Sequence, residues 1–108
     1  MYVAETLKNR ILRVVLHSSG VYHTSVFHQF SGRLGPTALA VSQSGQIYAA
    51  RFDFMEVNQH GLITVLNADG TVEEELLIND CPEITGLFFS KVQDDILYAT
   101  STNSLLKI

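Results

Sequence analysis

Hydrophobic residues along this chain recur at every second position or in short runs, without the i, i+3, i+4 spacing of an amphipathic helix. The hydrophobic segments are rich in Val, Ile, Leu, Tyr and Phe, and clusters of Gly, Asp, Asn and Ser separate them. The pattern predicts ten β-strands, at Met1–Ala4, Arg10–His17, Ser25–Phe30, Ala38–Val41, Gln46–Arg51, Gly61–Leu66, Glu73–Leu77, Ile84–Phe89, Ile96–Thr100 and Leu105–Ile108. The sequence therefore predicts an all-β fold.

One order of segments occurs three times along the chain. The stretch Tyr2–Val14 is similar to Tyr48–Val65 and to Tyr98–Ile108, so that three tyrosines fall at corresponding positions, 46 and 50 residues apart. Repeats of this length with four strands each are typical of β-propeller blades. We therefore predict a β-propeller rather than a β-sandwich, which would lack the repeated order.

The repeats divide the ten strands into three blades. Residues 1–36 carry the second, third and fourth strands of one blade, residues 37–83 a complete blade, and residues 84–108 the first three strands of another. The chain would thus hold about two and a half four-stranded antiparallel blades, whereas a propeller closes its ring with 4–8. We expect the chain to be part of a longer protein and, studied alone, to self-associate through its exposed blade faces.

Composition narrows the classes of function. The 108 residues suit one small domain, and the net charge of −4 rests on only 17% charged residues. No basic stripe neutralises phosphates, which argues against nucleic acid, and no hydrophobic run approaches the ~20 residues that span a bilayer. The start of the chain lacks the basic and hydrophobic regions of a signal peptide, which favours the cytoplasm. Cys81 is the only cysteine, so we expect no internal disulfide.

Three segments resemble the blades of a known family. They read YVAETLKNRILRV at Tyr2–Val14, GPTALAVSQSGQIYAAR at Gly35–Arg51 and ITGLFFSKVQDDILYAT at Ile84–Thr100. Together they resemble the senescence marker protein/gluconolactonase/luciferin-regenerating-enzyme family of six-bladed propellers, over essentially the whole chain. The resemblance implies hydrolysis of small-molecule substrates, sugar lactones or related esters, helped by one divalent cation, often calcium, at the propeller centre. NHL-repeat and strictosidine-synthase-like propellers use closely similar segments.

The metal ligands of the family carry over poorly. Where the family usually reads Pro-Asp-Gly-Leu-Ala-Val-Asp, the chain reads Pro-Thr-Ala-Leu-Ala-Val-Ser over Pro36–Ser42, so Thr37 occupies the position of an Asp ligand. A neutral hydroxyl is a weaker calcium ligand than a carboxylate and cannot act as a general base near neutral pH. The resemblance places the Asn and Glu ligands upstream of Met1. We therefore assign no catalytic residue and expect the isolated chain to be inactive.

The change from Asp to Thr37 leaves an alternative function open. A non-catalytic NHL-like or strictosidine-synthase-like propeller could serve as a binding scaffold. Two carboxylates nevertheless remain candidates for a site on a propeller face, because Glu5 and Asp53 each follow a strand that starts near a blade tyrosine. With Thr37 they form the candidate set for a cation or a substrate. A structural ion pair between Arg51 and Asp53 is the competing expectation.

The other polar and aromatic residues favour structural roles. No two of the four histidines have the i, i+2 or i, i+4 spacing of a local zinc site. His23 and His28, five residues apart, are expected on opposite faces of one strand. The run Glu73–Glu75 is expected at a solvated sheet edge. The three blade tyrosines, Phe88 and Phe89 are expected in the core between blades.

Overall fold

The computed structural model describes residues 1–32, 34–53, 60–79, 83–90, 96–101 and 105–107. The elements are β1 (Tyr2–Glu5), the 3-10 helix η1 (Thr6–Lys8), β2 (Arg10–Leu16), β3 (Tyr22–Gln29), β4 (Leu34–Val41), β5 (Ile47–Asp53), β6 (His60–Leu66), β7 (Val72–Asn79), β8 (Ile84–Phe89), β9 (Leu97–Ser101) and β10 (Leu105–Lys107). No helix in this part of the chain is long and apolar enough to cross a membrane. Every predicted strand has a counterpart, so the all-β prediction is confirmed.

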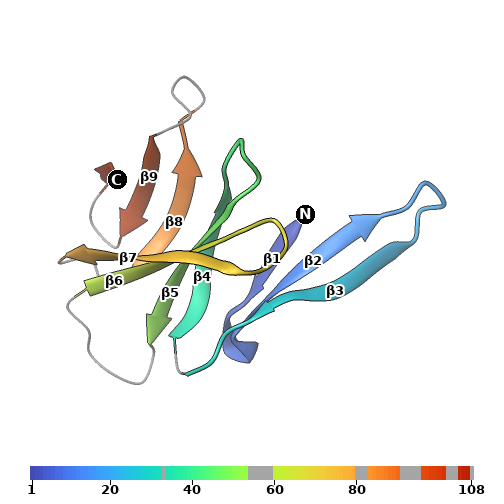
Figure 1. The fold of residues 1–108 in the computed structure, drawn as a ribbon, viewed down its shortest axis with the longest axis horizontal. Helices are drawn as coiled ribbons and strands as arrows, with labels where there is room; N and C mark the ends of the chain where they lie inside the picture. The colour runs from blue at the N-terminus through green and yellow to red at the C-terminus, as the bar shows by residue number, and fades with distance from the viewer. Residues whose placement is uncertain (33, 54–59, 80–82, 91–95, 102–104, 108) are drawn as a thin grey trace.

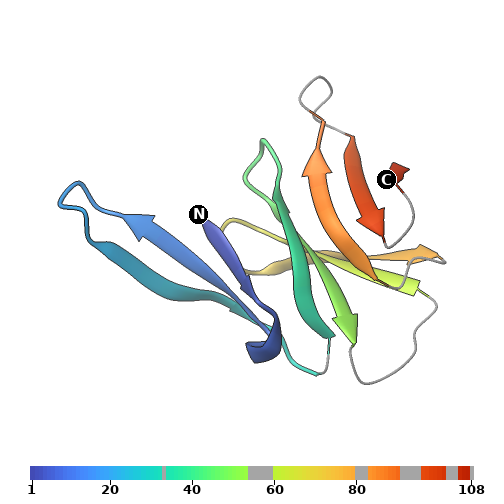
Figure 2. The ribbon, with the colours of Figure 1, turned by 180° about the vertical axis from the view of Figure 1, so that it is seen from behind.

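The strands form three antiparallel sheets that stand side by side (Figure 1). Blade 1 is β1-β2-β3, blade 2 is β4-β5-β6-β7 and blade 3 is β8-β9-β10, each named from its inner strand outwards. The inner strand of blade 2, β4, contacts both β1 and β8, and it lies between them in the view from behind (Figure 2). Inner strands that meet while the sheets fan outwards are the arrangement of propeller blades. The predicted fold class, a fragment of a β-propeller, is confirmed.

β4 is longer than the sequence predicted. It begins at Leu34, because its first residues also pair with the end of β5. The register shifts between Pro36 and Ala38, which leaves Thr37 as an extra residue in the strand, and blade 3 has the same irregularity at Thr85. A β-bulge of this kind bends the strand and redirects the side chain of the extra residue. Both threonines are therefore freed from the regular alternation of their strands.

Two hydrophobic clusters lie between the blades. Adjacent residues of β5 face opposite neighbours, because Ala49 belongs to the cluster between blades 1 and 2 and Ala50 to the one between blades 2 and 3. The first cluster consists of Ile11, Phe30, Ile47, Ala49 and Leu66, and the second of Ala50, Ile63, Ile84, Leu87, Leu97 and Ala99. Each Å² of apolar surface removed from water contributes roughly 25 cal/mol. Burial between the blades is therefore the main stabilising contribution to the fold.

A close backbone approach holds blade 1 against blade 2. The turn between β1 and β2 is η1, which ends at Asn9 with φ 56° and packs on β4. A Cβ atom at Gly35 of β4 would lie 2.5 Å from the backbone oxygen of Thr6. The Thr6 hydroxyl also donates a hydrogen bond to the Pro36 carbonyl at 2.8 Å. Glycine is thus required at position 35 for η1 to reach β4.

The expectation for the aromatic residues is confirmed in part. The ring of Tyr48 lies 5.1 Å from that of Phe89, across the junction of blades 2 and 3. Tyr2 packs against the cluster between blades 1 and 2. Phe88 and Tyr98 instead stack on each other at 5.3 Å, on the face of blade 3 that is turned away from blade 2, and Phe88 is 47% exposed. For these two rings the prediction of inter-blade packing was wrong within this chain.

The prediction that His23 and His28 lie on opposite faces of their strand was wrong. His23 pairs with Val15 and His28 with Ile11, and these partners lie four residues apart on β2. Paired residues of an antiparallel ladder share a face, so both histidines lie on the same one. The reason is a register shift between Ile11 and Leu12, where β3 carries one extra residue and its alternation reverses.

We predict that Gly35→Ala lowers the free energy of unfolding by about 1–3 kcal/mol, the usual cost of extra volume in a packed site. The new Cβ meets backbone, which cannot rotate away as a side chain can. Chemical denaturation followed by circular dichroism measures the change. The matched control is Gly86→Ala, because its Cβ would meet only the Thr100 hydroxyl and blade 2 carries Ala38 at the same position. Equal stability of Gly35→Ala and the native chain would contradict the close approach.

Candidate functional site

Thr37 lies at the bulge on the inner strand of blade 2. Its hydroxyl is 2.9 Å from the Ile84 carbonyl of blade 3 and 3.3 Å from the Ala50 carbonyl of its own blade. A hydroxyl carries one proton and donates to one acceptor at a time, and the shorter contact is the one between blades. The structure thus uses the Thr37 side chain as a hydrogen-bond donor that bridges blades 2 and 3.

Two further threonines form hydrogen bonds near the inner strands, Thr6 from η1 and Thr85 from β8. The carbonyls of Pro36 and Ile84 correspond in the repeat, because both residues precede the bulge of their strand. Thr6 donates to the first of these carbonyls as Thr37 donates to the second. Thr85, the counterpart of Thr37 in blade 3, donates to a carbonyl of β9 at 3.1 Å. Threonine hydroxyls therefore connect successive blades near the propeller centre.

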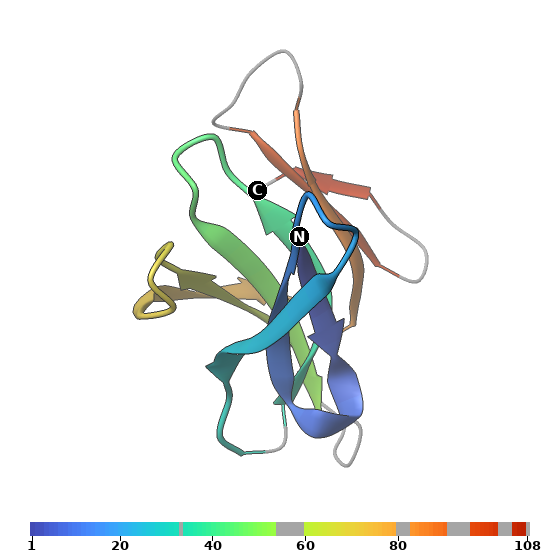
Figure 3. The same ribbon diagram turned by 90° about the vertical axis from the view of Figure 1, so that its right-hand side faces the viewer.

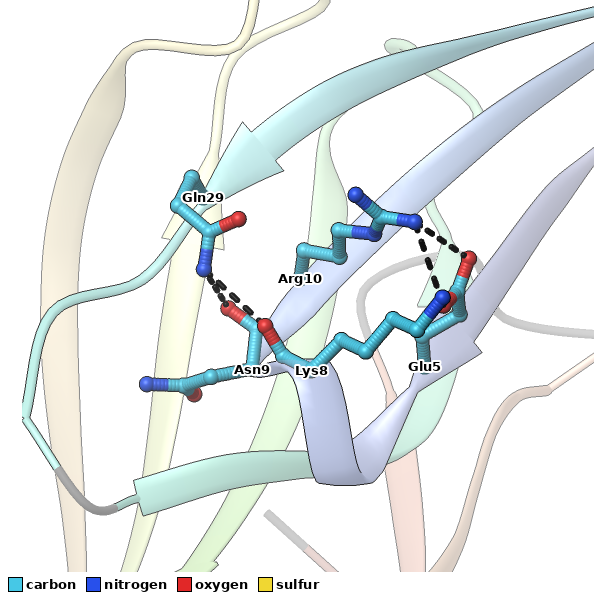
Figure 4. Close-up of polar contacts among 5 residues, drawn as sticks. All are labelled: Glu5, Lys8, Asn9, Arg10 and Gln29. Carbon is cyan, nitrogen blue, oxygen red and sulfur yellow. Dashed lines mark hydrogen bonds and ion pairs between the residues drawn. The ribbon is translucent and has the colours of Figure 1, made fainter.

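Glu5 ends β1 and is paired with two cations of its own blade (Figure 4). Arg10 Nη2 lies 3.3 Å from Glu5 Oε1, and Lys8 Nζ lies 3.6 Å from Glu5 Oε2. The Glu5 side chain is 24% exposed, so solvent still reaches the carboxylate. Within the described ranges, no hydrogen bond or ion pair joins Glu5 to Thr37. Direct contacts therefore do not join these two predicted site residues into one site.

A polar cluster beside Glu5 orders the turn that packs on β4. Gln29 of β3 donates from Nε2 to the carbonyls of Lys8 and Asn9, at 3.0 and 2.9 Å (Figure 4). Asn9 Nδ2 donates to the Gly32 carbonyl at 2.9 Å. These bonds tie the outer strand of blade 1 and the chain beyond it to the turn between β1 and β2. The cluster therefore supports the junction between blades 1 and 2.

Arg51 is 8% exposed and lies between blades 1 and 2. Its Nε donates to the Leu34 carbonyl at 3.0 Å, its Nη2 donates to the Ser31 carbonyl at 3.3 Å, and its guanidinium lies 4.1 Å from the centre of the Phe30 ring. Burial holds the pKa of Arg51 below its ordinary value, and Glu75, whose Oε1 lies 3.6 Å from Nη1, acts in the opposite direction. Arg51 thus binds the segment of chain that connects blade 1 to blade 2, through the carbonyls of Ser31 and Leu34.

The sequence did not predict this role for Arg51. It predicted an ion pair with Asp53, whose side chain lies outside the described residues, so that pairing stays a prediction. Glu75, expected at a solvated edge, is 53% exposed and nevertheless pairs with Arg51. A signal was present in the sequence, because Arg51 continues the buried alternation of β5, where a charged side chain needs partners.

Arg51 also lines a cavity of about 510 Å³ between blades 1 and 2. The lining residues are His28, Gln29, Phe30, Ser31, Leu34, Arg51, Leu62, Thr64, Val72 and Glu75. This volume lies in the range of small-molecule sites. However, the Arg51 guanidinium binds backbone carbonyls, and His28 Nδ1 lies 2.9 Å from the Gly70 carbonyl of blade 2. Both side chains therefore hold the blades together.

The donor set of the described residues does not fit a calcium site. None of their His, Cys, Asp and Glu side chains form a group of three or more that could hold a metal ion. The Thr37 hydroxyl already donates to a carbonyl, Glu5 is ion-paired, and calcium takes 6–8 oxygen ligands. We therefore derive no chemical step through a cation from these residues.

The repeated antiparallel sheets, the meeting of their inner strands and the hydrophobic clusters between them define the chain as consecutive blades of a β-propeller. The family model described as SMP-30/Gluconolactonase/LRE-like region matches residues 1–103, nearly the whole chain. The chain therefore belongs to the SMP-30/gluconolactonase/LRE-like family, as its blade segments predicted. A search of curated proteins found no match. The match does not favour the NHL-like or strictosidine-synthase-like alternative.

We predict that Thr37→Val lowers the free energy of unfolding by about 1–2 kcal/mol, because a near-isosteric change removes the donor and leaves the Ile84 carbonyl without it. Thr85→Val is the matched control. Thr85 is exposed and, among the described residues, its hydroxyl bonds within blade 3, so we expect a change within about 0.5 kcal/mol. Urea denaturation of both variants measures the difference. Equal losses for the two variants would show that the bridge between blades contributes nothing of its own.

Proposed function

We propose that this chain forms part of a hydrolase that opens sugar lactones or related esters. The observation that supports the proposal is the family match over residues 1–103, whose description names gluconolactonase. A small-molecule substrate would bind near the propeller centre, where the inner strands meet. A divalent cation, often calcium, belongs to the same proposal and would take most of its ligands from outside the residues described above.

The isolated chain would be inactive under this proposal. Opening a lactone with water needs a group that takes a proton from the water, and a carboxylate or an imidazole is the usual base. The Thr37 hydroxyl cannot play this part near neutral pH, and it is engaged with the Ile84 carbonyl. The carboxylate oxygens of Glu5 are engaged with Arg10 and Lys8. Neither Thr37 nor Glu5 therefore supplies an evident base.

A graft tests the proposal. Residues 1–103 replace the corresponding blades of an active gluconolactonase of the family, with Thr37, Thr37→Asp or Thr37→Asn. We expect Thr37→Asp to raise kcat/KM for gluconolactone at least about tenfold in the presence of calcium, because a carboxylate can serve as ligand or base. Thr37→Asn is the matched control, since it has the same shape without the charge. A pH-stat measures turnover, and thermal melting shows which grafts are folded.

Two outcomes would each contradict one part of the proposal. If the folded Thr37→Asp graft is no more active than the Thr37→Asn graft, position 37 has no part in lactone hydrolysis. If the 108-residue chain alone hydrolyses gluconolactone faster than buffer does, the claim that it lacks a complete site is wrong.

A further inference from the structure

Blade 1 has one face that no other blade covers in this chain (Figure 3, in which blade 1 lies nearest the viewer). Val3, Leu12 and Val26 form a row across this face, because they are successive partners in the ladders of β1, β2 and β3. Val3 is 39% and Val26 is 50% exposed. The row places hydrophobic side chains in solvent in the middle of a sheet, where a folded propeller has another blade.

Blade 3 has the opposite face uncovered. Phe88 pairs with Tyr98 and stacks on it, and the neighbouring row runs from Gly86 through Thr100 to Leu105. Phe88 is 47% and Leu105 is 63% exposed. This face is again hydrophobic along β8 and β9, and the row of Phe88 and Tyr98 ends at Lys107 on β10.

Both uncovered faces correspond to faces that are buried inside the chain. Val3 corresponds to Ala49 of blade 2, because each follows the blade tyrosine, and Ala49 is fully buried against blade 1. Leu105 corresponds to Ile63, because their partners Thr100 and Ala50 are equivalent, and Ile63 is fully buried against blade 3. The uncovered faces are thus the two complementary halves of one kind of interface, which the chain already makes twice.

We propose that a second copy of this chain covers both faces, with blade 3 of each copy packed against blade 1 of the other. The repeat indicates that the partner is a second copy. Each uncovered face is equivalent to a face that packs on a neighbouring blade inside the chain, and a second copy supplies a blade face of that same kind. The number of copies follows from closure. Two copies of these three blades provide six, within the 4–8 blades of closed propellers, whereas three copies provide too many. A two-fold axis then buries all four uncovered faces.

Side-chain size also suits this pairing. Phe88 stands where blade 2 carries the smaller Ala40, which faces the inner strand of blade 3. In the part of blade 1 that is described, the innermost strand is β1, which occupies the place of β5 and not of β4. The Phe88 ring of one copy can therefore occupy the space that an inner strand would otherwise fill beside β1 of the other.

Sedimentation equilibrium of the 108-residue chain from micromolar to millimolar concentration tests the proposal. We expect a single reversible step from the chain mass of 12.0 kDa to twice that mass and no further. Val26→Lys and Leu105→Lys each place a charge in the interface, and each should raise the dissociation constant at least about tenfold. Leu77→Lys is the control, because Leu77 is 64% exposed on the outer strand of blade 2, away from both faces. Circular dichroism verifies that each variant is folded.

A mixture of the two folded variants separates head-to-tail pairing from the pairing of like faces. A mixed dimer of Val26→Lys and Leu105→Lys has one unaltered interface, whereas each variant alone has none, so mixing should restore association. A monomer at every concentration, growth beyond two copies, weakening by only one of the two variants, or a mixture no tighter than its components would each overturn the proposal.

Discussion

The fold depends on how closely β4 approaches the inner strands on either side of it. Small residues permit the approach, since Gly35 leaves room for η1 of blade 1, and Ala50 and Ala99 are fully buried between blades 2 and 3. Threonine hydroxyls then join the strands, from Thr6 to β4 and from Thr37 to β8. Hydrophobic burial supplies most of the stabilising free energy, and these directional bonds fix how one blade sits on the next.

This use of the inner strands bears directly on the chemistry of the chain. Thr37 occupies the position where the resemblance implies a reactive carboxylate. In this chain its hydroxyl instead donates a hydrogen bond from blade 2 to blade 3. Glu5, another candidate, is held by cations of its own blade. A fold can keep its architecture while a residue at a catalytic position is replaced by one with a structural role, because fold and function are specified by different residues. Membership of a lactonase-like family and the absence of an assigned catalytic residue are therefore compatible in this chain.

Much of the fold could be predicted because strands and turns leave local patterns. β8 was predicted to the residue, and the spacing of the tyrosines identified the blades. β3 and β4 begin earlier than expected, because pairing partners and bulges set strand ends. The roles of Thr37 and Arg51 could not be predicted, since their partners Ile84 and Ser31 lie 47 and 20 residues away. Only the assembled blades bring such groups together.

The most direct test of this account is native-state hydrogen exchange, measured residue by residue on a dilute sample of the chain. Blade 2 is covered on both faces, so the amides of β5 and β6 should exchange most slowly, through global unfolding alone. The amides of β3, on the outside of blade 1, should exchange faster through local opening. Equal protection of all three blades, or faster exchange in blade 2 than in blade 1, would contradict the claim that packing on both sides of blade 2 holds the structure together.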